Sequence, residues 1–323
     1  MVRFIVTAPL PDQVRTLLPS GDLVEFPGPD PAPRPALVEA MSGAEGLLCT
    51  LVDRVDHDLL SAAPLLRVVS QLAVGVDNID VPACTRRAIP VGHTPDVLTD
   101  TTADTALAIL LSVIRRLPEG QALVRAGEWE RWSLDLLSGE DLHGSTVGIV
   151  GLGRIGAAIA RRLTGFGVQM LYSAPRRKPS LEAHLRIGYR SLEGLLAESD
   201  HVILCAPLNA STRGIIDASA LARMKPTATL INIARGPLVD HEALADALAS
   251  GQLGRAGLDV TDPEPIPADH RLVSMPNCLI VPHIGSASTG TRIKMATRAI
   301  ENLRAGLEGA RLRWCVNPEV YDP

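Results

Sequence analysis

The first hundred residues alternate between short apolar runs and stretches with the polar–apolar spacing of helices. Short runs of this kind are typical of buried strands. The alternation therefore predicts a small parallel sheet with helices on both faces. The predicted strands are Arg3–Thr7, Leu23–Phe26, Gly46–Leu51, Leu66–Ser70 and Ile89–Gly92, and the predicted helices are Asp12–Leu18, Ala36–Met41, Asp56–Ala62 and Val81–Arg87. The proline-rich stretch 27–35 is expected to be a surface loop.

A second series of the same kind begins at Ser145. Six strands separated by helices predict a complete doubly wound dinucleotide fold. Its predicted strands are Val147–Val150, Val168–Tyr172, His201–Cys205, Thr229–Ile233, Ala256–Val260 and Leu279–Val281. A helix at Thr102–Leu117 precedes this series, and a last helix at Ser288–Leu307 follows it. Because apolar residues cover more than one face of the first helix, we expect it to be buried between domains or subunits.

The two series predict an α/β protein of two doubly wound parallel-sheet domains, and a chain of 323 residues suits two domains. The long helices flank the second series, so the C-terminal segment is expected to return to the first domain. The predicted boundaries are 1–98 plus 287–323 for a discontinuous substrate domain and 99–286 for the nucleotide-binding domain.

Three glycines follow the first strand of the second series at 151, 153 and 156, and a helix-forming run comes after them. A strand, the spacing G-x-G-x-x-G and a helix together form a dinucleotide-binding turn. Gly151 permits the tight turn, Gly153 lets the backbone approach a pyrophosphate, and Gly156 allows close packing. The N–H groups around Arg154 and Ile155 are expected to face the phosphates.

Net charge, apolar run length and cysteine spacing narrow the possible classes of protein function further. The net charge is −5 with no long run of either sign, which argues against a nucleic-acid or anionic-membrane surface. No apolar stretch approaches the roughly 20 residues of a membrane span, and the N-terminus is read as a first strand rather than a signal peptide. The five cysteines are widely spaced with no CxxC, so we expect reduced thiols in a cytoplasmic protein and no metal site.

Three polar residues follow predicted strand ends in the second series: Arg235, Glu264 and His283. In an open α/β sheet these strand ends lie along the same edge as the nucleotide loop. The combination suits hydride transfer to a 2-oxo acid, which needs a cation for the substrate oxygens and a proton donor for the alkoxide. Arg235 can bind the oxygens through its planar fork, His283 can supply the proton, and Glu264 can orient the imidazole and favour its protonated form.

In the first series, Val74 and Gly75 follow directly on a predicted strand end. Gly75 could bring backbone N–H groups close to an anion. We expect these groups to hold the substrate carboxylate.

The residues after the second strand of the second series indicate which cofactor is bound. An NAD-preferring site normally ends this strand with Asp or Glu, which binds the ribose hydroxyls. Here the chain reads VQMLYSAPRRKP, with Ser173 in place of an acid and with Arg176 and Arg177 close behind. An acid would repel a 2′-phosphate and these bases would attract it, so the sequence predicts NADPH as the cofactor, with NADH as a weaker alternative.

The motifs GLGRIG, INIARGPLVD, GLDVTDPEPIP and VPHIGSAS, in this order, resemble the D-isomer-specific 2-hydroxyacid dehydrogenases. The stretches VGHTPDVLTDTTAD, RRLPEG and GEWERW are most similar to the glyoxylate/hydroxypyruvate reductases of that family. The resemblance implies flavodoxin-like and Rossmann-like domains and a homodimer formed through the nucleotide domain. It also implies that Arg235, Glu264 and His283 are catalytic and that Val74 and Gly75 bind the carboxylate.

By the same resemblance Asp259 contacts the nicotinamide amide and Ser286 lies near the substrate. The remaining residues implied to contact the cofactor are Pro207, Thr212, Ile233, His283 and Gly285. One departure concerns the segment after Trp129 and Trp132, where such reductases carry a further tryptophan that reaches toward the partner's active site. This chain has Leu136 there, so we expect its pocket to admit larger 2-oxo acids.

Two alternatives remain open at this stage. The chain could be another D-2-hydroxyacid dehydrogenase, such as a 2-ketogluconate reductase or a phosphoglycerate dehydrogenase. It could instead be a nucleotide-sensing binding protein, because transcriptional corepressors share the fold and the three polar residues. Oxidation of the reduced cofactor in the presence of glyoxylate would distinguish an enzyme from a binding protein.

Overall fold

The computed structural model describes residues 1–26, 28 and 32–322, and the chain divides into two compact units. Unit 1 comprises Met1–Leu98 and Ala287–Pro323, and unit 2 comprises Thr99–Ser286. Each unit contains one sheet whose strands pair in parallel, so the predicted fold class is confirmed. The proline-rich stretch 27–35 falls partly on residues 27 and 29–31, which lie outside the described residues.

The sheet of unit 1 has five strands in the order β2-β1-β3-β4-β5, the flavodoxin-like order. Its strands are β1 (Arg3–Val6), β2 (Asp22–Glu25), β3 (Gly46–Cys49), β4 (Val68–Gln71) and β5 (Val91–Gly92). Its helices are α1 (Asp12–Arg15), α2 (Arg34–Met41), α3 (His57–Ser61), α4 (Val81–Arg86), α13 (Thr289–Leu307) and the short 3₁₀ helix η3 (Pro318–Tyr321).

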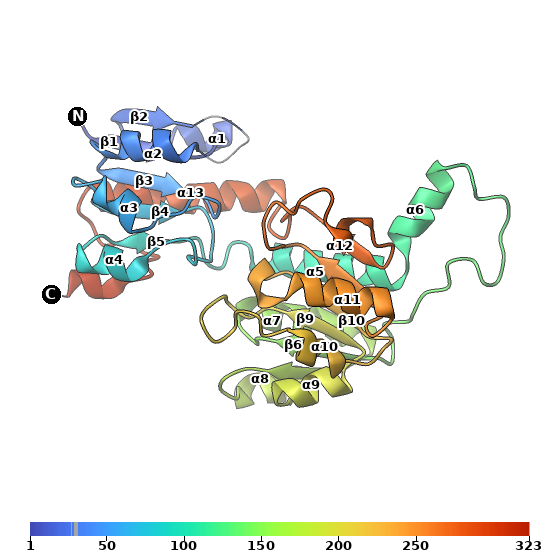
Figure 1. The fold of residues 1–323 in the computed structure, drawn as a ribbon. Helices are drawn as coiled ribbons and strands as arrows, with labels where there is room; N and C mark the ends of the chain where they lie inside the picture. Colours follow the sequence, from blue (N-terminus) through green and yellow to red (C-terminus); the bar gives the residue numbers. More distant parts are fainter. Residues whose placement is uncertain (27, 29–31, 323) are drawn as a thin grey trace. The chain divides into compact units, whose positions relative to one another are not determined.

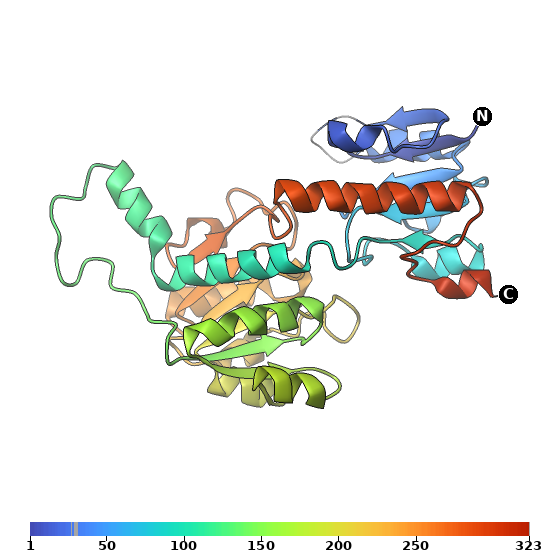
Figure 2. The same ribbon diagram turned by 180° about the vertical axis from the view of Figure 1, so that it is seen from behind.

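Two hydrophobic clusters cover the two faces of this sheet. One is formed with α2, α3 and α4, and the other with α1 and α13. The C-terminal helix α13 contacts β3 and β4 along their length (Figure 2). Residues more than two hundred positions apart in sequence therefore share one core, which makes unit 1 discontinuous.

The sheet of unit 2 has seven strands in the order β12-β11-β10-β9-β6-β7-β8 (Figure 1). This is the dinucleotide-binding order extended by one strand at the β12 edge. The strands are β6 (Thr146–Val150), β7 (Gln169–Ser173), β8 (Gly188–Tyr189), β9 (His201–Leu204), β10 (Thr229–Asn232), β11 (Arg255–Leu258) and β12 (Cys278–Ile280).

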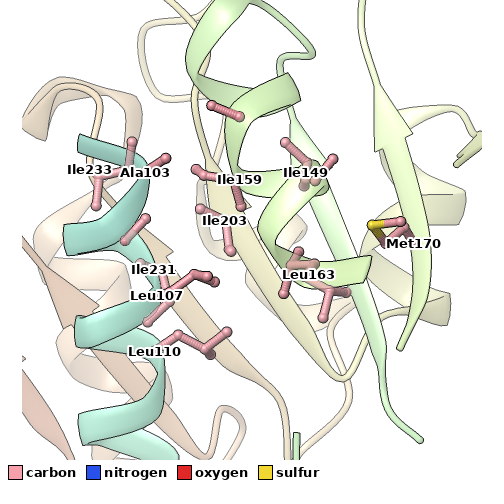
Figure 3. Close-up of a cluster of buried hydrophobic side chains, with 14 of the residues drawn as sticks. Ala103, Leu107, Leu110, Ile149, Ile159, Leu163, Met170, Ile203, Ile231 and Ile233 are labelled. Atoms are coloured by element: carbon pink, nitrogen blue, oxygen red, sulfur yellow. The ribbon is translucent and has the colours of Figure 1, made fainter. Parts of the chain in front are cut away.

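Helices cover both faces of this sheet as well. One face packs against α5 (Thr99–Ile114), α7 (Arg154–Leu163) and α8 (Pro179–Leu185), through a cluster that includes Leu110, Ile159 and Ile203 (Figure 3). The opposite face packs against α9 (Leu192–Glu198), α10 (Ala218–Ala222), α11 (His241–Ser250) and α12 (Arg271–Ser274). The 3₁₀ helices η1 (Thr164–Phe166) and η2 (Gly236–Leu238) complete the unit.

The structure differs from the sequence-based prediction at three places. The seventh strand, β8, was not predicted, because two residues carry no periodicity. The predicted helix Thr102–Leu117 ends at Ile114, and a separate helix α6 (Leu117–Arg125) follows. The break lies at Arg116, which has a left-handed backbone with φ of 55°, just before Pro118 at the start of α6. Finally, α5 packs against α7, β10 and β11 of its own unit, so its apolar surface is buried inside unit 2 rather than between domains.

Residues 117–138, called the arm below, begin with α6 and continue as an irregular chain. The arm projects away from the rest of unit 2 (Figure 1). None of the residues of α6 is buried. Exposed apolar side chains are concentrated on the arm: Leu117, Val124, Trp129, Trp132, Leu134 and Leu136.

Candidate active site

The glycine-rich turn connects β6 to α7 in unit 2. Gly151 has a positive φ of 97°, and a Cβ there would lie 2.8 Å from the backbone nitrogen of Ala206, so a side chain is excluded on both counts. A Cβ at Gly156 would lie 2.3 Å from the carbonyl oxygen of Gly151, so the helix packs directly against the turn. A Cβ at Gly153 meets nothing within 4 Å. The turn therefore has an open side at the N-terminus of α7, where helical N–H groups and the helix dipole favour an anion.

The segment that follows β7 carries the predicted cofactor-specificity residues. Ser173 is the last residue of β7, and its carbonyl oxygen accepts a hydrogen bond from the N–H of Gly151 at 2.8 Å. The end of β7 thus lies directly beside the glycine-rich turn. Lys178 strengthens this connection, because its Nζ donates to the carbonyl oxygen of Leu152 at 2.7 Å.

The two arginines of this segment have different surroundings. Arg177 donates to both carboxylate oxygens of Glu182, at 3.2 and 2.6 Å, and its guanidinium lies 5.6 Å from the ring centre of Tyr189. The hydrogen bond and charge of Arg177 hold the pKa of Glu182 at about 2, so this pair is ionised throughout the neutral range. Arg176 is exposed and forms no hydrogen bond or ion pair with any residue that the structure describes.

Arg235 follows β10 and is half-buried. Its Nη1 donates to the carbonyl oxygen of Ala234 at 2.8 Å. The next residue must be glycine, because a Cβ at Gly236 would lie 1.9 Å from the carbonyl oxygen of Thr261. This close approach joins the loop that carries Arg235 to the loop that carries Glu264.

His283 and Glu264 form a direct pair. The Nδ1 of His283 lies 2.5 Å from Glu264 Oε1, so Nδ1 is the donor and Nε2 remains for proton transfer. Glu264 Oε2 also accepts from the N–H of Thr261 at 3.2 Å. Burial raises the pKa of Glu264, but the hydrogen bond and charge of His283 outweigh burial and hold that pKa below its usual value. The carboxylate is thus ionised when it contacts the imidazole.

Asp259, at the end of β11, holds the loop that carries His283. Its carboxylate accepts from the N–H groups of Ile284 at 2.6 Å and Gly285 at 2.9 Å, and its carbonyl oxygen accepts from the N–H of His283. The backbone of His283 has a φ of 52°, unusual for a residue with a side chain, and these bonds maintain it. Burial raises the pKa of Asp259, although the two N–H groups favour its ionised form.

The other predicted residues are distributed over both units. Pro207 and Thr212 lie in the loop after β9, where Thr212 Oγ1 donates to the carbonyl oxygen of Pro207 at 2.7 Å. Ile233 and Gly285 are buried after β10 and β12, and Ser286 is the last residue of unit 2. Unit 2 therefore contains the three proposed catalytic residues and all predicted cofactor contacts. Val74 and Gly75 belong to unit 1, after β4.

Sequence reasoning missed one residue that fixes this site. Asn232, the last residue of β10, is fully buried. Its Nδ2 donates to the carbonyl oxygen of Arg235 at 2.8 Å, and its Oδ1 accepts from the N–H of Ala234 at 3.1 Å. An asparagine at a strand end just before a turn was the available signal, because this side chain commonly bonds backbone groups two or three residues onward.

The described residues contain no group of His, Cys, Asp and Glu side chains placed to hold a metal ion. Among their helices, none is both long and apolar enough to cross a membrane.

The chain is similar to known proteins over most of its length. A family model described as "D-isomer specific 2-hydroxyacid dehydrogenase, NAD binding domain" matches residues 107–285. The glyoxylate reductase/hydroxypyruvate reductase of Mus musculus is 46% identical over 314 residues, which are 96% of each chain. The glyoxylate reductase of Thermococcus kodakarensis is 44% identical over 323 residues, covering 98% of this chain and 97% of the relative.

Solved structures show the same relationship. The NADPH-dependent glyoxylate/hydroxypyruvate reductase of Sinorhizobium meliloti, in complex with NADP and malonate, has a TM-score of 0.88 and 36% identity, and the match covers 98% of this chain and 97% of that one. The match length and identity confirm the resemblance predicted from the four motifs. The chain therefore belongs to the D-isomer specific 2-hydroxyacid dehydrogenase family of NAD(P)-dependent oxidoreductases.

Proposed function

We propose that the protein reduces small 2-oxo acids, glyoxylate and hydroxypyruvate, to the D-2-hydroxy acids with NADPH. The observation that carries this proposal is the 2.5 Å contact between His283 Nδ1 and Glu264 Oε1. The loop of Glu264 lies directly against the loop of Arg235, and both belong to the unit that contains the glycine-rich turn. The names of the relatives in Mus musculus and Thermococcus kodakarensis support the choice of substrates.

The residues of unit 2 divide the chemistry among them. When bound, the nicotinamide supplies the hydride that reduces the substrate carbonyl. Arg235 binds the carbonyl and carboxylate oxygens with its planar guanidinium. The Nε2 of His283 donates a proton to the carbonyl oxygen as that oxygen becomes an alkoxide. Glu264 holds the imidazole by Nδ1, which leaves Nε2 to face the substrate.

The substrate and cofactor amide have further proposed contacts. The N–H groups near Val74 and Gly75 bind the substrate carboxylate, and Ser286 lies near the substrate. Asp259 accepts from the nicotinamide amide in addition to holding the His283 loop. The effect of Leu136 on the size of the pocket stays a prediction.

We also propose that NADPH is preferred over NADH. The glycine-rich turn fits a dinucleotide. Its side at Gly153 is open, whereas a Cβ at Gly151 or Gly156 would clash with neighbouring backbone atoms. At the end of β7 the chain presents Ser173 and the exposed Arg176, with no carboxylate. The NADP bound to the Sinorhizobium meliloti reductase supports this preference. Arg177 contributes to the positive charge, but its guanidinium is already bonded to Glu182.

We also propose that the protein is a homodimer and that it is located in the cytoplasm. The arm of unit 2 exposes two tryptophans and several aliphatic side chains, which suit a subunit interface. The five cysteines are free thiols, which suits a reducing compartment.

A panel of 2-oxo acids with both reduced cofactors tests this function. We expect glyoxylate and hydroxypyruvate to give the highest kcat/KM, with NADPH favoured about tenfold or more because a charge-assisted hydrogen bond is worth about 1.5–3 kcal/mol. Arg235→Lys, which keeps the charge but loses the planar fork, should lower kcat/KM for glyoxylate strongly. Absence of cofactor oxidation with every 2-oxo acid would favour the binding-protein alternative, and better efficiency with NADH would reject the cofactor assignment.

A further inference from the structure

Two successive carbonyl groups of unit 1, those of Val74 and Gly75, lie within hydrogen-bond distance of side chains. The Nδ1 of His93 lies 3.0 Å from the carbonyl oxygen of Val74, and the Nε2 of Gln71 donates to the carbonyl oxygen of Gly75 at 3.2 Å. Because a carbonyl oxygen can only accept, Nδ1 of His93 carries the proton. Two side chains from different parts of unit 1 therefore hold two successive peptide groups.

The direction of these carbonyls determines the direction of the neighbouring N–H groups. In a trans peptide the C=O of one residue and the N–H of the next point in opposite directions. The bond to Val74 thus turns the N–H of Gly75 away from His93, and the bond to Gly75 turns the N–H of Val76 away from Gln71. Neither N–H has a hydrogen-bond partner among the residues that the structure describes. Backbone N–H groups without a protein partner are available to bind an anion.

Gln71 is itself held by a network of hydrogen bonds. Gln71 is fully buried at the end of β4, and its Nε2 also donates to Asn78 Oδ1 at 2.7 Å. Asn78 in turn donates to the carbonyl oxygens of Thr50 at 3.0 Å and Asp53 at 2.7 Å. Because Gln71 is buried and Asn78 fixes its amide, the orientation of the Gly75 carbonyl is held before any ligand binds.

We propose that Gln71 and His93 are positioning residues, which turn the N–H groups of Gly75 and Val76 toward the substrate carboxylate by holding the carbonyl groups of Gly75 and Val74. This inference rests on the proposed function, and it identifies the two N–H donors and the side chains that aim them. Neither side chain contacts the carboxylate itself.

Variants of the two residues test the inference, with oxamate as a non-reacting 2-oxo carboxylate. Gln71→Met removes the amide at similar length, and His93→Phe removes the ring donor. Each should raise the KM for glyoxylate and the Kd for oxamate about tenfold, as expected when a donor to a carboxylate is misaligned, with a smaller change in kcat. His93→Asn should restore both constants to within about twofold of wild type, because Asn Nδ2 occupies the position of His Nδ1.

Matched controls separate positioning from general damage. Cys49→Ala alters a buried neighbour whose thiol donates to Gln71 Oε1, but it leaves the bond from Nε2 to Gly75 in place, so its KM should not change. The Kd for NADPH should be unchanged in all variants, since its proposed contacts lie in unit 2. If Gln71→Met fails to fold, His93→Phe and its rescue by Asn carry the test.

The outcomes distinguish this inference from the proposed function. Oxamate binding is measured by calorimetry on the enzyme saturated with NADPH, so it requires no turnover. Wild type could bind oxamate more tightly than Gln71→Met and His93→Phe and yet oxidise no NADPH with glyoxylate. In that case the proposed function fails and the inference holds. Unchanged KM and Kd values in folded variants overturn the inference, as does a wild type that reduces glyoxylate but does not bind oxamate.

Discussion

At the scale of single residues, His283 is the group on which the proposed reaction depends most directly. Its Nδ1 is occupied by Glu264 and its Nε2 is the remaining proton carrier. His283→Ala should lower kcat for glyoxylate reduction by about 10²–10⁴-fold, the usual contribution of a general acid, with little change in the Kd for NADPH. Steady-state kinetics and fluorescence titration measure the two quantities. His57→Ala, an exposed histidine of unit 1, is the control, and full activity of His283→Ala would remove His283 from the mechanism.

The charge of Glu264 predicts a change in pH dependence. Burial raises its pKa, but the contact with His283 holds the pKa below the usual value, so the carboxylate is lost only as pH falls through that lowered pKa. Above it, the ionised carboxylate accepts from Nδ1 of His283 and orients the ring for proton transfer. Glu264→Gln removes the group that titrates, so kcat should be lower across the neutral range and should lose the decline that wild type shows as pH falls through the lowered pKa of Glu264. A profile of log kcat against pH measures the decline, and profiles that coincide would contradict the role of Glu264.

Arg176 and Arg177 are adjacent in sequence, yet they should differ in their effect on cofactor preference. Arg177 is bonded to Glu182, whereas Arg176 has no partner among the described residues. Arg176→Ala should reduce the ratio of NADPH to NADH efficiency about tenfold or more, and Arg177→Ala should reduce it less. The kcat/KM values for NADH serve as the internal control. A larger loss in Arg177→Ala would show that Arg177 leaves Glu182 to bind the phosphate.

At the scale of elements, the arm is the feature with an unexplained exposed surface. Trp132 is 76% exposed and Leu134 is 85% exposed, and a monomer gains nothing from apolar side chains in water. If the arm forms the proposed dimer interface, Trp132→Asp combined with Leu134→Asp should shift the protein from dimer to monomer in sedimentation velocity. Val273→Asp, at an exposed apolar position of α12 outside the arm, should leave the dimer intact. An unchanged dimer in the double variant would place the interface elsewhere.

At the scale of the whole molecule, two buried histidines link stability to pH. Burial lowers the pKa of His201 and of His241, and neither ring nitrogen of His201 has a partner among the described residues. Below about pH 6.5 the unfolded chain therefore binds protons that the folded chain resists. The free energy of unfolding should fall as pH decreases below this value, by up to about 1.4 kcal/mol per pH unit for each histidine.

Urea unfolding between pH 7.5 and pH 5.5 tests this dependence. His201→Leu should flatten the decline, because the leucine has no proton to bind in either state. The exposed His57 provides the comparison, and His57→Ala should leave the slope unchanged. Equal slopes in wild type and His201→Leu would contradict the contribution of His201.

The sequence by itself determined the fold class, the glycine-rich turn and the three polar residues of the candidate site. These features could be predicted because their signals are local or topological. A glycine spacing between a strand and a helix needs only neighbouring residues, and the carboxyl ends of parallel strands share one edge whatever the side chains are. The same reasoning could not detect β8, whose two residues have no period, and it extended α5 through the break at Arg116.

Only the tertiary structure decided how individual side chains are employed. Arg176 and Arg177 are equivalent in sequence, and the difference between them arises from Glu182 on the following helix. Gln71 and His93 bond successive carbonyl groups of one segment although they are 22 positions apart in sequence, and Asn232 is recognisable only through the backbone groups that it bonds. The physical reason is that a hydrogen bond requires distance and direction between specific atoms, and folding sets these by packing whole elements together.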